Sequence, residues 1–189
     1  RFAFSGCAGL RSMTLPFVGL RRGSVNGYGN NFGYILGGSG NAFAETYQRY
    51  ADSGSNVYAY NYIPTNLVSV TITDETTLGY GAFQNCTMLK DVRINAGVTN
   101  LGSYAFANSG ITNLTTVLPA AVKSIGNYAF QNCAALEKIV LPDTVSSIGT
   151  YAFQKDANLT DVTLSKGLTI IPSYAFANCA DLEELVIPK

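Results

Sequence analysis

Histidine is absent from this chain of 189 residues, and charged side chains are scarce. Without histidine, Ser-His-Asp catalysis, Cys-His catalysis and a histidine-containing zinc site are all excluded. Charged residues make up 13% of the sequence, about half the share found in ordinary soluble domains. The 12 basic and 12 acidic residues cancel, so the composition gives no electrostatic footprint for nucleic acid. No apolar run approaches the roughly 18 residues of a membrane-spanning helix, and we expect no direct insertion of this segment into a membrane.

The dipeptide Ala-Phe recurs along the chain, and from Phe83 onward its spacing is 23, 24, 23 and 23 residues. Around each phenylalanine the same residue types return: leucine or isoleucine five positions before it, usually tyrosine two before, usually cysteine three after, and leucine six after. Self-similarity at such a period is the signature of a repeat architecture. We therefore assign the repeated phenylalanines and leucines to the structural core: Phe4, Phe83, Phe106, Phe130, Phe153, Phe176, Leu89, Leu136, Leu159 and Leu182.

Each repeat ends in an alternating apolar pair, such as Ile139 and Leu141, which is the period-2 pattern of a short strand. One repeat cannot bury all its large apolar side chains within itself, whereas stacked copies bury them against one another. Successive strands then lie about 4.8 Å apart in a parallel sheet. The spacing therefore predicts a right-handed spiral of short parallel strands joined by turns and loops.

Segments 122–142 (VKSIGNYAFQNCAALEKIVLP) and 145–164 (VSSIGTYAFQKDANLTDVTL) resemble the BspA-like leucine-rich repeat family of bacterial surface proteins. The resemblance covers residues 1–16 and roughly residues 66–189. It implies a leucine-rich-repeat solenoid, which belongs to the α/β class, and an extracellular or bacterial cell-surface location. It also implies adhesion to a host or microbial protein, and the family defines no catalytic residues and no cofactor. The opening Arg1-Phe2-Ala3-Phe4 matches the middle of a repeat, so we expect a mature or trimmed fragment without its signal peptide.

The 23-residue pattern disappears between residues 16 and 66. We interpret residues 1–16 as a first partial repeat, residues 17–65 as an insertion, here named the aromatic segment, and residues 66–189 as further repeats of one continuous domain. The aromatic segment holds seven of the 12 tyrosines and nine of the 19 glycines. Helical spacing of its aromatic residues predicts a short amphipathic helix over residues 41–52, and alternation predicts a strand over residues 57–63.

The tyrosines Tyr47, Tyr58, Tyr60 and Tyr62 of this segment have two interpretations. They form a satellite core that seals the segment against the repeats, since an ordered insertion of this length needs apolar burial of its own. Alternatively they form a recognition surface, because tyrosine supplies large, rigid contact area and is enriched at interfaces, and stacked rings also suit sugars. A solvent-accessible cluster of three or more tyrosines would favour recognition, and full burial would remove it.

The four cysteines, Cys7, Cys86, Cys133 and Cys179, recur at one position of the repeat. Equivalent positions two coils apart are separated by roughly 10 Å, beyond the distance of about 7 Å between Cα atoms that a disulfide can span. We therefore predict four free, buried thiols that act as small apolar groups. None of the cysteines has the partner spacing of a metal site.

Polar residues beside the apolar strand positions point away from the predicted core. Among them Arg93, Lys138, Asp161 and Glu184 are candidates for a binding surface on the sheet. Asp161 and Glu184 would be neighbours about 5 Å apart, which is close to the spacing of a retaining glycosidase pair. An ordinary column of ion pairs, with Lys138 beside Asp161, is the simpler interpretation.

The sequence thus favours a non-enzymatic binding module that takes a protein partner through its sheet face and its aromatic segment. Two alternatives stay open. One is a carbohydrate-recognition element of a larger surface protein, for which a glycan is the partner. The other is a structural spacer that holds another domain away from the cell wall.

Overall fold

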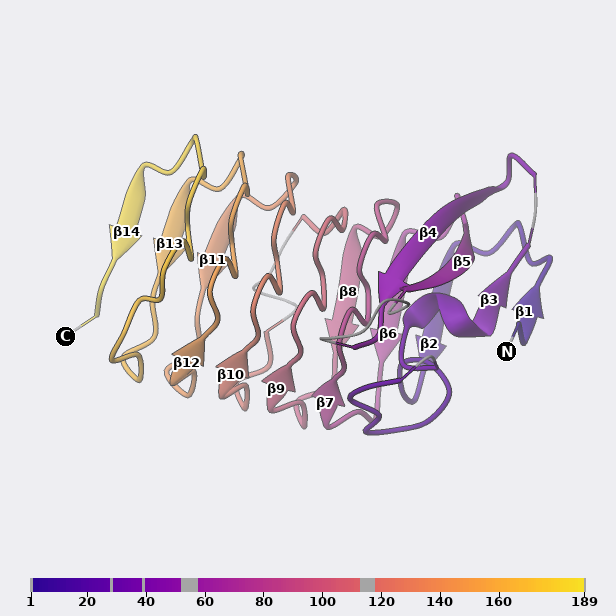
Figure 1. The fold of residues 1–189 in the computed structure, drawn as a ribbon, viewed down its shortest axis with the longest axis horizontal. Helices are drawn as coiled ribbons and strands as arrows, with labels where there is room; N and C mark the ends of the chain where they lie inside the picture. Colours follow the sequence, from indigo (N-terminus) through magenta and orange to yellow (C-terminus); the bar gives the residue numbers. More distant parts are fainter. Residues whose placement is uncertain (1, 28, 39, 52–57, 113–117, 189) are drawn as a thin grey trace.

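In the computed structural model the described residues are 2–27, 29–38, 40–51, 58–112 and 118–188, and they form an elongated solenoid of stacked coils (Figure 1). One wall is built from parallel strands in two sets. The first set is β2 (Ser12–Leu15), β6 (Ser69–Ile72) and β8 (Asp91–Ile94), and the second is β11 (Lys138–Val140), β13 (Asp161–Thr163) and β14 (Glu184–Val186). The sequence between β8 and β11 includes residues 113–117, which lie outside the described ranges.

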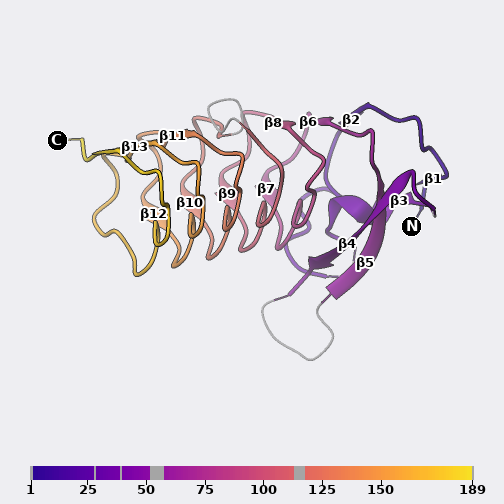
Figure 2. The same cartoon turned by 90° about the horizontal axis from the view of Figure 1, so that it is seen from above.

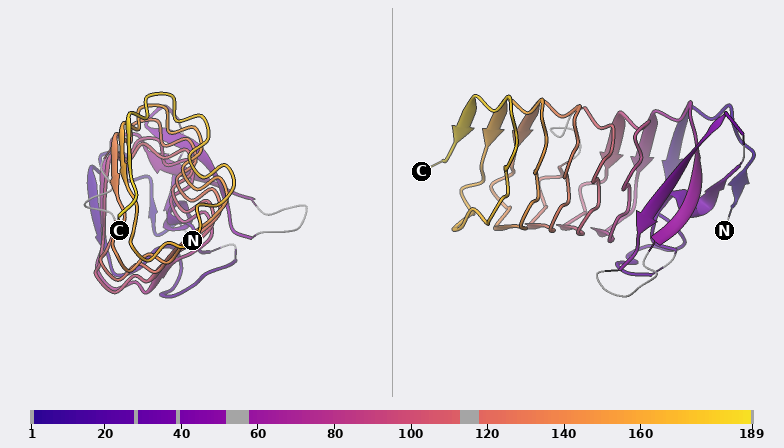
Figure 3. Two further views of the ribbon diagram at one scale, coloured as in Figure 1. Left: turned by 90° about the vertical axis from the view of Figure 1, so that its left-hand side faces the viewer. Right: turned by 45° about the horizontal axis from the view of Figure 1, so that its top comes forward.

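A second wall is a four-stranded parallel ladder of very short strands. These are β7 (Thr77–Leu78), β9 (Asn100–Leu101), β10 (Ser124–Ile125) and β12 (Ser147–Ile148). The view along the solenoid axis shows the coils lying over one another, with the two walls and a third side of turns enclosing a common interior (Figure 3). Apolar side chains from both walls fill that interior, because each strand turns one face inward.

The strand register confirms the stacking that the repeat spacing predicts. Ser12 pairs with Ser69, which pairs with Asp91. Farther along, Lys138 pairs with Asp161, which pairs with Glu184. Residues that occupy the same place in successive repeats therefore lie beside one another in neighbouring coils, and the fold is a leucine-rich-repeat solenoid.

A column of phenylalanines runs through the turn side of the core. The rings of Phe83, Phe106, Phe130 and Phe153 are fully buried, and their centroids lie 5.2–5.3 Å apart. The backbone N–H of each of these four phenylalanines donates to the carbonyl of the alanine that precedes the next phenylalanine of the column, as Phe106 does to Ala129 at 2.7 Å. Leu89, Leu136 and Leu159 are equally buried. The remaining predicted core residues lie on outer coils and are only partly buried: Phe4, Phe176 and Leu182.

The turn beside this column uses left-handed backbone at two positions of each repeat. Tyrosines occupy the first, with φ of 57–60° at Tyr104, Tyr128, Tyr151 and Tyr174, and their rings stack with centroids 4.7–4.9 Å apart. Asparagine usually occupies the second, and asparagine tolerates this conformation better than most residues. The Asn108 side chain donates to Asn85 at 2.8 Å and the Asn132 side chain donates to Asn108 at 2.9 Å. Both positions thus form ladders along the outside of the coils.

The aromatic segment adds a short helix and three strands at the amino-terminal end. They are the 3₁₀ helix η1 (Phe32–Ile35), β3 (Leu36–Gly37), β4 (Phe43–Arg49) and β5 (Tyr58–Pro64). β3 pairs with β1 (Phe4–Ser5) in parallel, and β4 pairs with β5 as an antiparallel hairpin. Seen from above, the hairpin lies on the flank opposite the wall that contains β6 and β8 (Figure 2).

The expected helix over residues 41–52 is wrong, because residues 43–49 form the strand β4. The spacing of Phe43, Tyr47 and Tyr50 fits a helix. However, the residues that the strand buries, Thr46 and Gln48, are polar, so hydrophobic periodicity does not reveal their alternation. Pairing with β5 overrides the local pattern. The expected strand over residues 57–63 is correct where it is described, as β5.

Burial of the thiols differs along the cysteine column. All four thiols are free; Cys86 and Cys133 are buried, whereas Cys7 is exposed and Cys179 is half-buried. The prediction of four buried thiols is therefore wrong for Cys7 and only partly correct for Cys179. The physical reason is that both lie in end coils of the described structure, where the core has a neighbour on one side only. Burial raises the pKa of Cys86 and of Cys133, and it raises that of Cys179 to about 11.

An acidic residue interrupts the same column. Asp156 is fully buried between the coils that carry Cys133 and Cys179. Its Oδ1 accepts a hydrogen bond of 2.7 Å from the Cys133 backbone N–H, and its Oδ2 has no hydrogen-bond partner among the described residues. Burial raises the pKa of this carboxyl to about 9, so the carboxyl is protonated at neutral pH.

Candidate functional site

The inner face of the β4–β5 hairpin is joined to the solenoid by hydrogen bonds from buried polar side chains. The Gln48 amide donates to the Ala82 carbonyl at 3.2 Å and accepts from the Gly33 N–H at 3.0 Å. The Gln84 side chain accepts from the Arg49 N–H at 2.7 Å. The Asn85 side chain also donates to the Tyr47 carbonyl, so two side chains of the repeats bond the backbone of β4 and hold the hairpin in one position on the flank.

One glycine leaves space for this contact. Gly81 stands two positions before Phe83, where later repeats carry tyrosine, and it shares their left-handed backbone with φ of 58°. A Cβ at this position would lie 2.2 Å from the carbonyl oxygen of Arg49 in β4. The preceding residue supplies a tyrosine ring instead, since the ring centroids of Tyr80 and Tyr104 lie 5.5 Å apart with their planes tilted by 38°. Gly81 therefore lets the hairpin approach the coil without interrupting the tyrosine ladder.

The outer face of the hairpin carries the exposed tyrosines. Tyr47, Tyr58 and Tyr60 are 49%, 40% and 61% exposed. The Tyr47 ring lies 5.7 Å from that of Tyr58 in an edge-to-face arrangement and 6.4 Å from that of Tyr60. Tyr62, at the other end of the same face, is half-buried. This arrangement meets the condition set above for recognition, a solvent-accessible cluster of three tyrosines, although a binding role remains a prediction. We name Tyr47, Arg49, Tyr58 and Tyr60 the hairpin face.

Arg49 connects the hairpin face to the tyrosine ladder of the solenoid. Its guanidinium carbon lies 5.1 Å from the ring centroid of Tyr58, 5.0 Å from that of Tyr104 and 5.9 Å from that of Tyr80. Its Nη1 donates to the Tyr58 hydroxyl at 3.0 Å. Burial alone would lower the pKa of Arg49, but the surrounding Tyr80, Tyr58 and Tyr104 outweigh that effect and raise it. The result is a half-buried cation placed among aromatic rings.

The charged candidates on the sheet wall are largely paired with one another. Arg93 contacts Asp91 at 3.1 Å, and Lys138 contacts Asp161 at 3.2 Å. Glu184 is exposed at the end of the same column. Hydrogen bonds from Thr160 and Lys138 lower the pKa of Asp161, which is opposite to the direction that an acid catalyst of a glycosidase pair requires.

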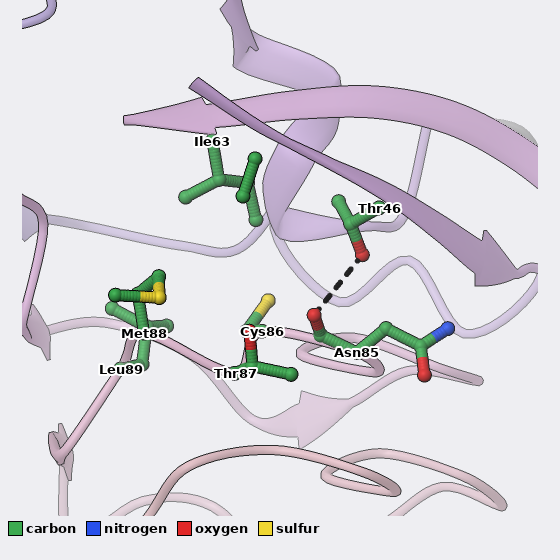
Figure 4. Close-up of a pocket in the computed structure, with 8 residues that line it drawn as sticks. Thr46, Ile63, Asn85, Cys86, Thr87, Met88 and Leu89 are labelled. Atoms are coloured by element: carbon green, nitrogen blue, oxygen red, sulfur yellow. Dashed lines mark hydrogen bonds between the residues drawn. The ribbon is translucent and has the colours of Figure 1, made fainter. Parts of the chain in front are cut away.

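Four hollows lie within the described part of the chain, and none of these four is lined by a residue of the hairpin face. One lies between the hairpin and the following turn and is lined by Thr46, Ile63, Cys86 and Leu89, among others (Figure 4). Its volume of about 10 Å³ holds at most one water molecule. A larger hollow of about 330 Å³ is lined by Leu164, Ile170 and Ile187, among others. It lies at the end of the apolar core, in the last described coil. The described residues contain no group of three or more potential metal ligands, and none of their helices is long and apolar enough to cross a membrane.

Sequence reasoning named the tyrosines of the hairpin face but missed two residues that place them. Gly81 is visible in the sequence as the missing tyrosine of one repeat, although the repeat pattern alone does not say what fills that space. Arg49 carries no signal of its own, because its importance comes from rings that are distant in the chain: Tyr104 is on a different coil.

The geometry defines the chain as a leucine-rich-repeat solenoid, a class of scaffold that is typically non-enzymatic and binds other molecules through its surface. The chain belongs to the family described as the BspA type leucine-rich repeat region, whose model matches six copies over residues 55–183.

Three solved structures are similar to the chain. A leucine-rich repeat protein of T. pallidum is 29% identical, with a TM-score of 0.59, and the match covers 65% of this chain and 57% of that one. A leucine-rich repeat protein of Bacteroides ovatus is 27% identical with a TM-score of 0.54, over 65% of this chain and 38% of that one. A leucine-rich cell surface protein of Faecalibacterium prausnitzii shares the fold, with 19% identity and a TM-score of 0.61 over 94% of this chain and 48% of that one.

In each case the chain spans well under two thirds of the length of its structural neighbour. Among curated proteins, none matches the chain.

Proposed function

We propose that this chain is a protein-binding module of a bacterial surface protein and that the hairpin face is its principal contact surface. The observation that carries the proposal is the exposure of three clustered tyrosines, in which the Tyr47 ring contacts those of Tyr58 and Tyr60, on a hairpin that buried hydrogen bonds hold in place. Tyrosine and arginine dominate the energetic centres of protein interfaces. A rigid support also lowers the entropic cost of binding, since the contact residues are ordered beforehand.

The sheet wall is a weaker candidate for the principal surface. Its charges form the exposed pairs Arg93–Asp91 and Lys138–Asp161, and a partner would have to break or accommodate them. Surface ion pairs of this kind contribute about 0–1 kcal/mol. The sheet wall therefore provides the comparison surface for experiments on the hairpin face, through Arg93, Lys138, Asp161 and Glu184.

A cell-surface location and a role in adhesion belong to the same proposal. The support for the location is the family match together with the cell surface protein of Faecalibacterium prausnitzii that shares the fold. The support for adhesion is the combination of a stiff repeat scaffold with an aromatic surface on one flank.

Selection of binding peptides tests the proposed surface. A phage-displayed library of random peptides is selected against the immobilised protein, and each enriched peptide is measured by calorimetry. We expect the variant with Tyr47→Ser, Tyr58→Ser and Tyr60→Ser to bind at least about tenfold more weakly, which corresponds to 1.4 kcal/mol. The matched control, Arg93→Ala with Lys138→Ala on the sheet wall, should bind like the parent. Equal binding by the tyrosine variant and the parent would refute the assignment of the surface.

Carbohydrate recognition is the second candidate because exposed tyrosine rings also stack on sugars. The parent, the tyrosine variant and the sheet-wall control on a glycan array separate the two functions. Glycan binding that depends on the tyrosines, with no peptide enriched in the selection, would replace the protein partner by a glycan.

A further inference from the structure

Arg49 is a half-buried cation that lacks a carboxylate partner among the described residues. Four ion pairs are formed within that part of the chain, and none of them includes Arg49. The side chain is half-buried, its Nε is buried without a hydrogen-bond partner among the described residues, and its one described side-chain hydrogen bond goes to a neutral group, the Tyr58 hydroxyl. Removing a charge from water without an opposite charge is unfavourable. Within the described part of the chain the guanidinium therefore has no anionic partner, and an anion from outside would complete its contacts.

The rings around Arg49 leave a defined direction for such an anion. Tyr58 belongs to the hairpin and Tyr104 to the solenoid, and each ring centroid lies about 5 Å from the guanidinium carbon. Rings that cover the guanidinium in this way leave its edge as the remaining hydrogen-bonding side. Nη1 is already bonded to Tyr58, so Nη2 is the group available to an acceptor from outside. A carboxylate that approaches this edge would lie beside the exposed Tyr58 ring.

The distribution of charge along the hairpin face favours an acidic group of the partner at the end that carries Arg49. Tyr47 is paired with Tyr60 across the hairpin, Arg49 with Tyr58, and Glu45 with Tyr62. Arg49 and Glu45 are therefore at opposite ends of the tyrosine cluster, roughly 13 Å apart along an extended strand. The negative charge of Glu45 is too far away to neutralise Arg49 and would repel an anion only at the other end.

From this geometry we infer that the protein partner presents an acidic side chain, aspartate or glutamate, to Arg49 and an adjacent apolar or aromatic side chain to the tyrosines of the hairpin face. This inference rests on the proposed function and specifies the chemistry of its partner. A charge-assisted hydrogen bond in a partly desolvated site is stronger than a neutral one. The acid would therefore act as an anchor, and the tyrosines would supply contact area.

Substitutions in the partner provide the direct test. Peptides enriched from the random library are expected to contain aspartate or glutamate next to an apolar or aromatic residue. Replacement of that acid by its amide, Glu→Gln or Asp→Asn in the peptide, should weaken binding to the unchanged protein by at least about tenfold. Binding should also weaken as salt is added, because part of the interaction is between charges.

Substitutions of Arg49 give the reciprocal result. Arg49→Gln should weaken the acidic peptides by about tenfold or more and should remove the preference for acid over amide, while Arg49→Lys should retain part of that preference. The melting temperature and hydrogen exchange of β4 show whether the hairpin remains docked in each variant. The experiment with the Glu→Gln or Asp→Asn peptide needs no such control, because the protein itself is unchanged.

The outcomes separate the two proposals. If enriched peptides depend on the tyrosines but show no acid, and Arg49→Gln binds them like the parent, the acidic partner is wrong and the hairpin face stands. If the tyrosine variant binds every enriched peptide like the parent, the hairpin face is wrong, and the acidic partner is wrong with it.

Discussion

Phe32 packs against Phe83 with ring centroids 5.2 Å apart and ring planes tilted by 36°, although only Phe83 belongs to the repeat pattern. Phe32 is fully buried, and its backbone N–H donates to the Ala82 carbonyl at 2.8 Å. The phenylalanines of the repeats make the same hydrogen bond to the following coil. A residue of the aromatic segment thus extends the phenylalanine column by one position and anchors η1 to the repeats.

Replacement of Phe32 by alanine should therefore loosen the aromatic segment. We expect Phe32→Ala to lower the free energy of unfolding by about 3–5 kcal/mol, because it leaves a cavity beside Phe83. Hydrogen exchange should increase first in β4 and β5. Tyr60→Ala is the control, since Tyr60 is 61% exposed and exposed substitutions change stability by about 0.5 kcal/mol or less. Unaltered exchange in the hairpin of Phe32→Ala would contradict the anchoring role.

Gly81→Ala should displace the hairpin through a clash with β4. A Cβ at Gly81 would lie 2.2 Å from the Arg49 carbonyl oxygen, and overpacking of this kind costs about 1–3 kcal/mol. Gly40→Ala is the matched control, because Gly40 also has positive φ but would place its Cβ in open space. The comparison of the two variants by urea unfolding therefore separates the clash from the backbone strain. Equal losses of stability would mean that Gly81 is needed for its backbone conformation alone.

Asp156 should make stability decrease as the pH rises. Its pKa is about 9 in the folded chain against an ordinary 3.8, so the folded state binds the proton more tightly than the unfolded state. The favourable contribution of Asp156 is then fully present below about pH 4 and is lost between about pH 4 and pH 9, with a limiting slope of about 1.4 kcal/mol per pH unit.

Asp156→Asn should flatten this dependence and raise the free energy of unfolding at pH 8 relative to the parent. Urea unfolding at pH 5 and pH 8 measures both effects. Asp181→Asn, at an exposed position, should keep the pH dependence of the parent. A parent and an Asp156→Asn variant with parallel pH profiles would show that the buried carboxyl does not titrate in this range.

Lys155→Asn should stabilise the solenoid by restoring the asparagine ladder. Lys155 has left-handed backbone with φ of 65° and stands between Asn132 and Asn178 in the repeat order. Asparagine tolerates this conformation better, and its amide would reach Asn132 as Asn132 reaches Asn108. We expect a gain of about 0.5–1.5 kcal/mol, measured by thermal and urea unfolding. Lys155→Gln carries the amide without the conformational preference, so equal stability of the two variants would refute the explanation.

The solenoid is predictable from the sequence because the apolar residues that recur at a fixed spacing are also the residues that are buried. Val70, Val92 and Val162 each occupy an inward strand position, and all are buried. Stacking of equivalent residues follows from that pattern, so the register of β11, β13 and β14 could be written down residue by residue. The exposed Cys7 departs from it because an end coil lacks one neighbour.

The aromatic segment is predictable only in part, because its contacts are specific rather than repeated. Its tyrosines could be recognised as candidates for binding, and β5 followed from their alternation. β4 did not, since buried Thr46 and Gln48 are polar and are stabilised by hydrogen bonds to the solenoid. The position of Arg49 depends on Tyr104, and no local sequence rule relates two residues so far apart.

Gly81 determines which coil of the solenoid has room for the β4–β5 hairpin. Tyr104, Tyr128, Tyr151 and Tyr174 fill the corresponding place in later coils, and a side chain there is incompatible with a strand passing as close as β4 does. A glycine at position 81 is therefore one requirement for attaching the hairpin to this coil, beside the hydrogen bonds of Gln48 and Gln84. Transplanting the hairpin to another coil would begin by exchanging one tyrosine for glycine there and restoring tyrosine at position 81.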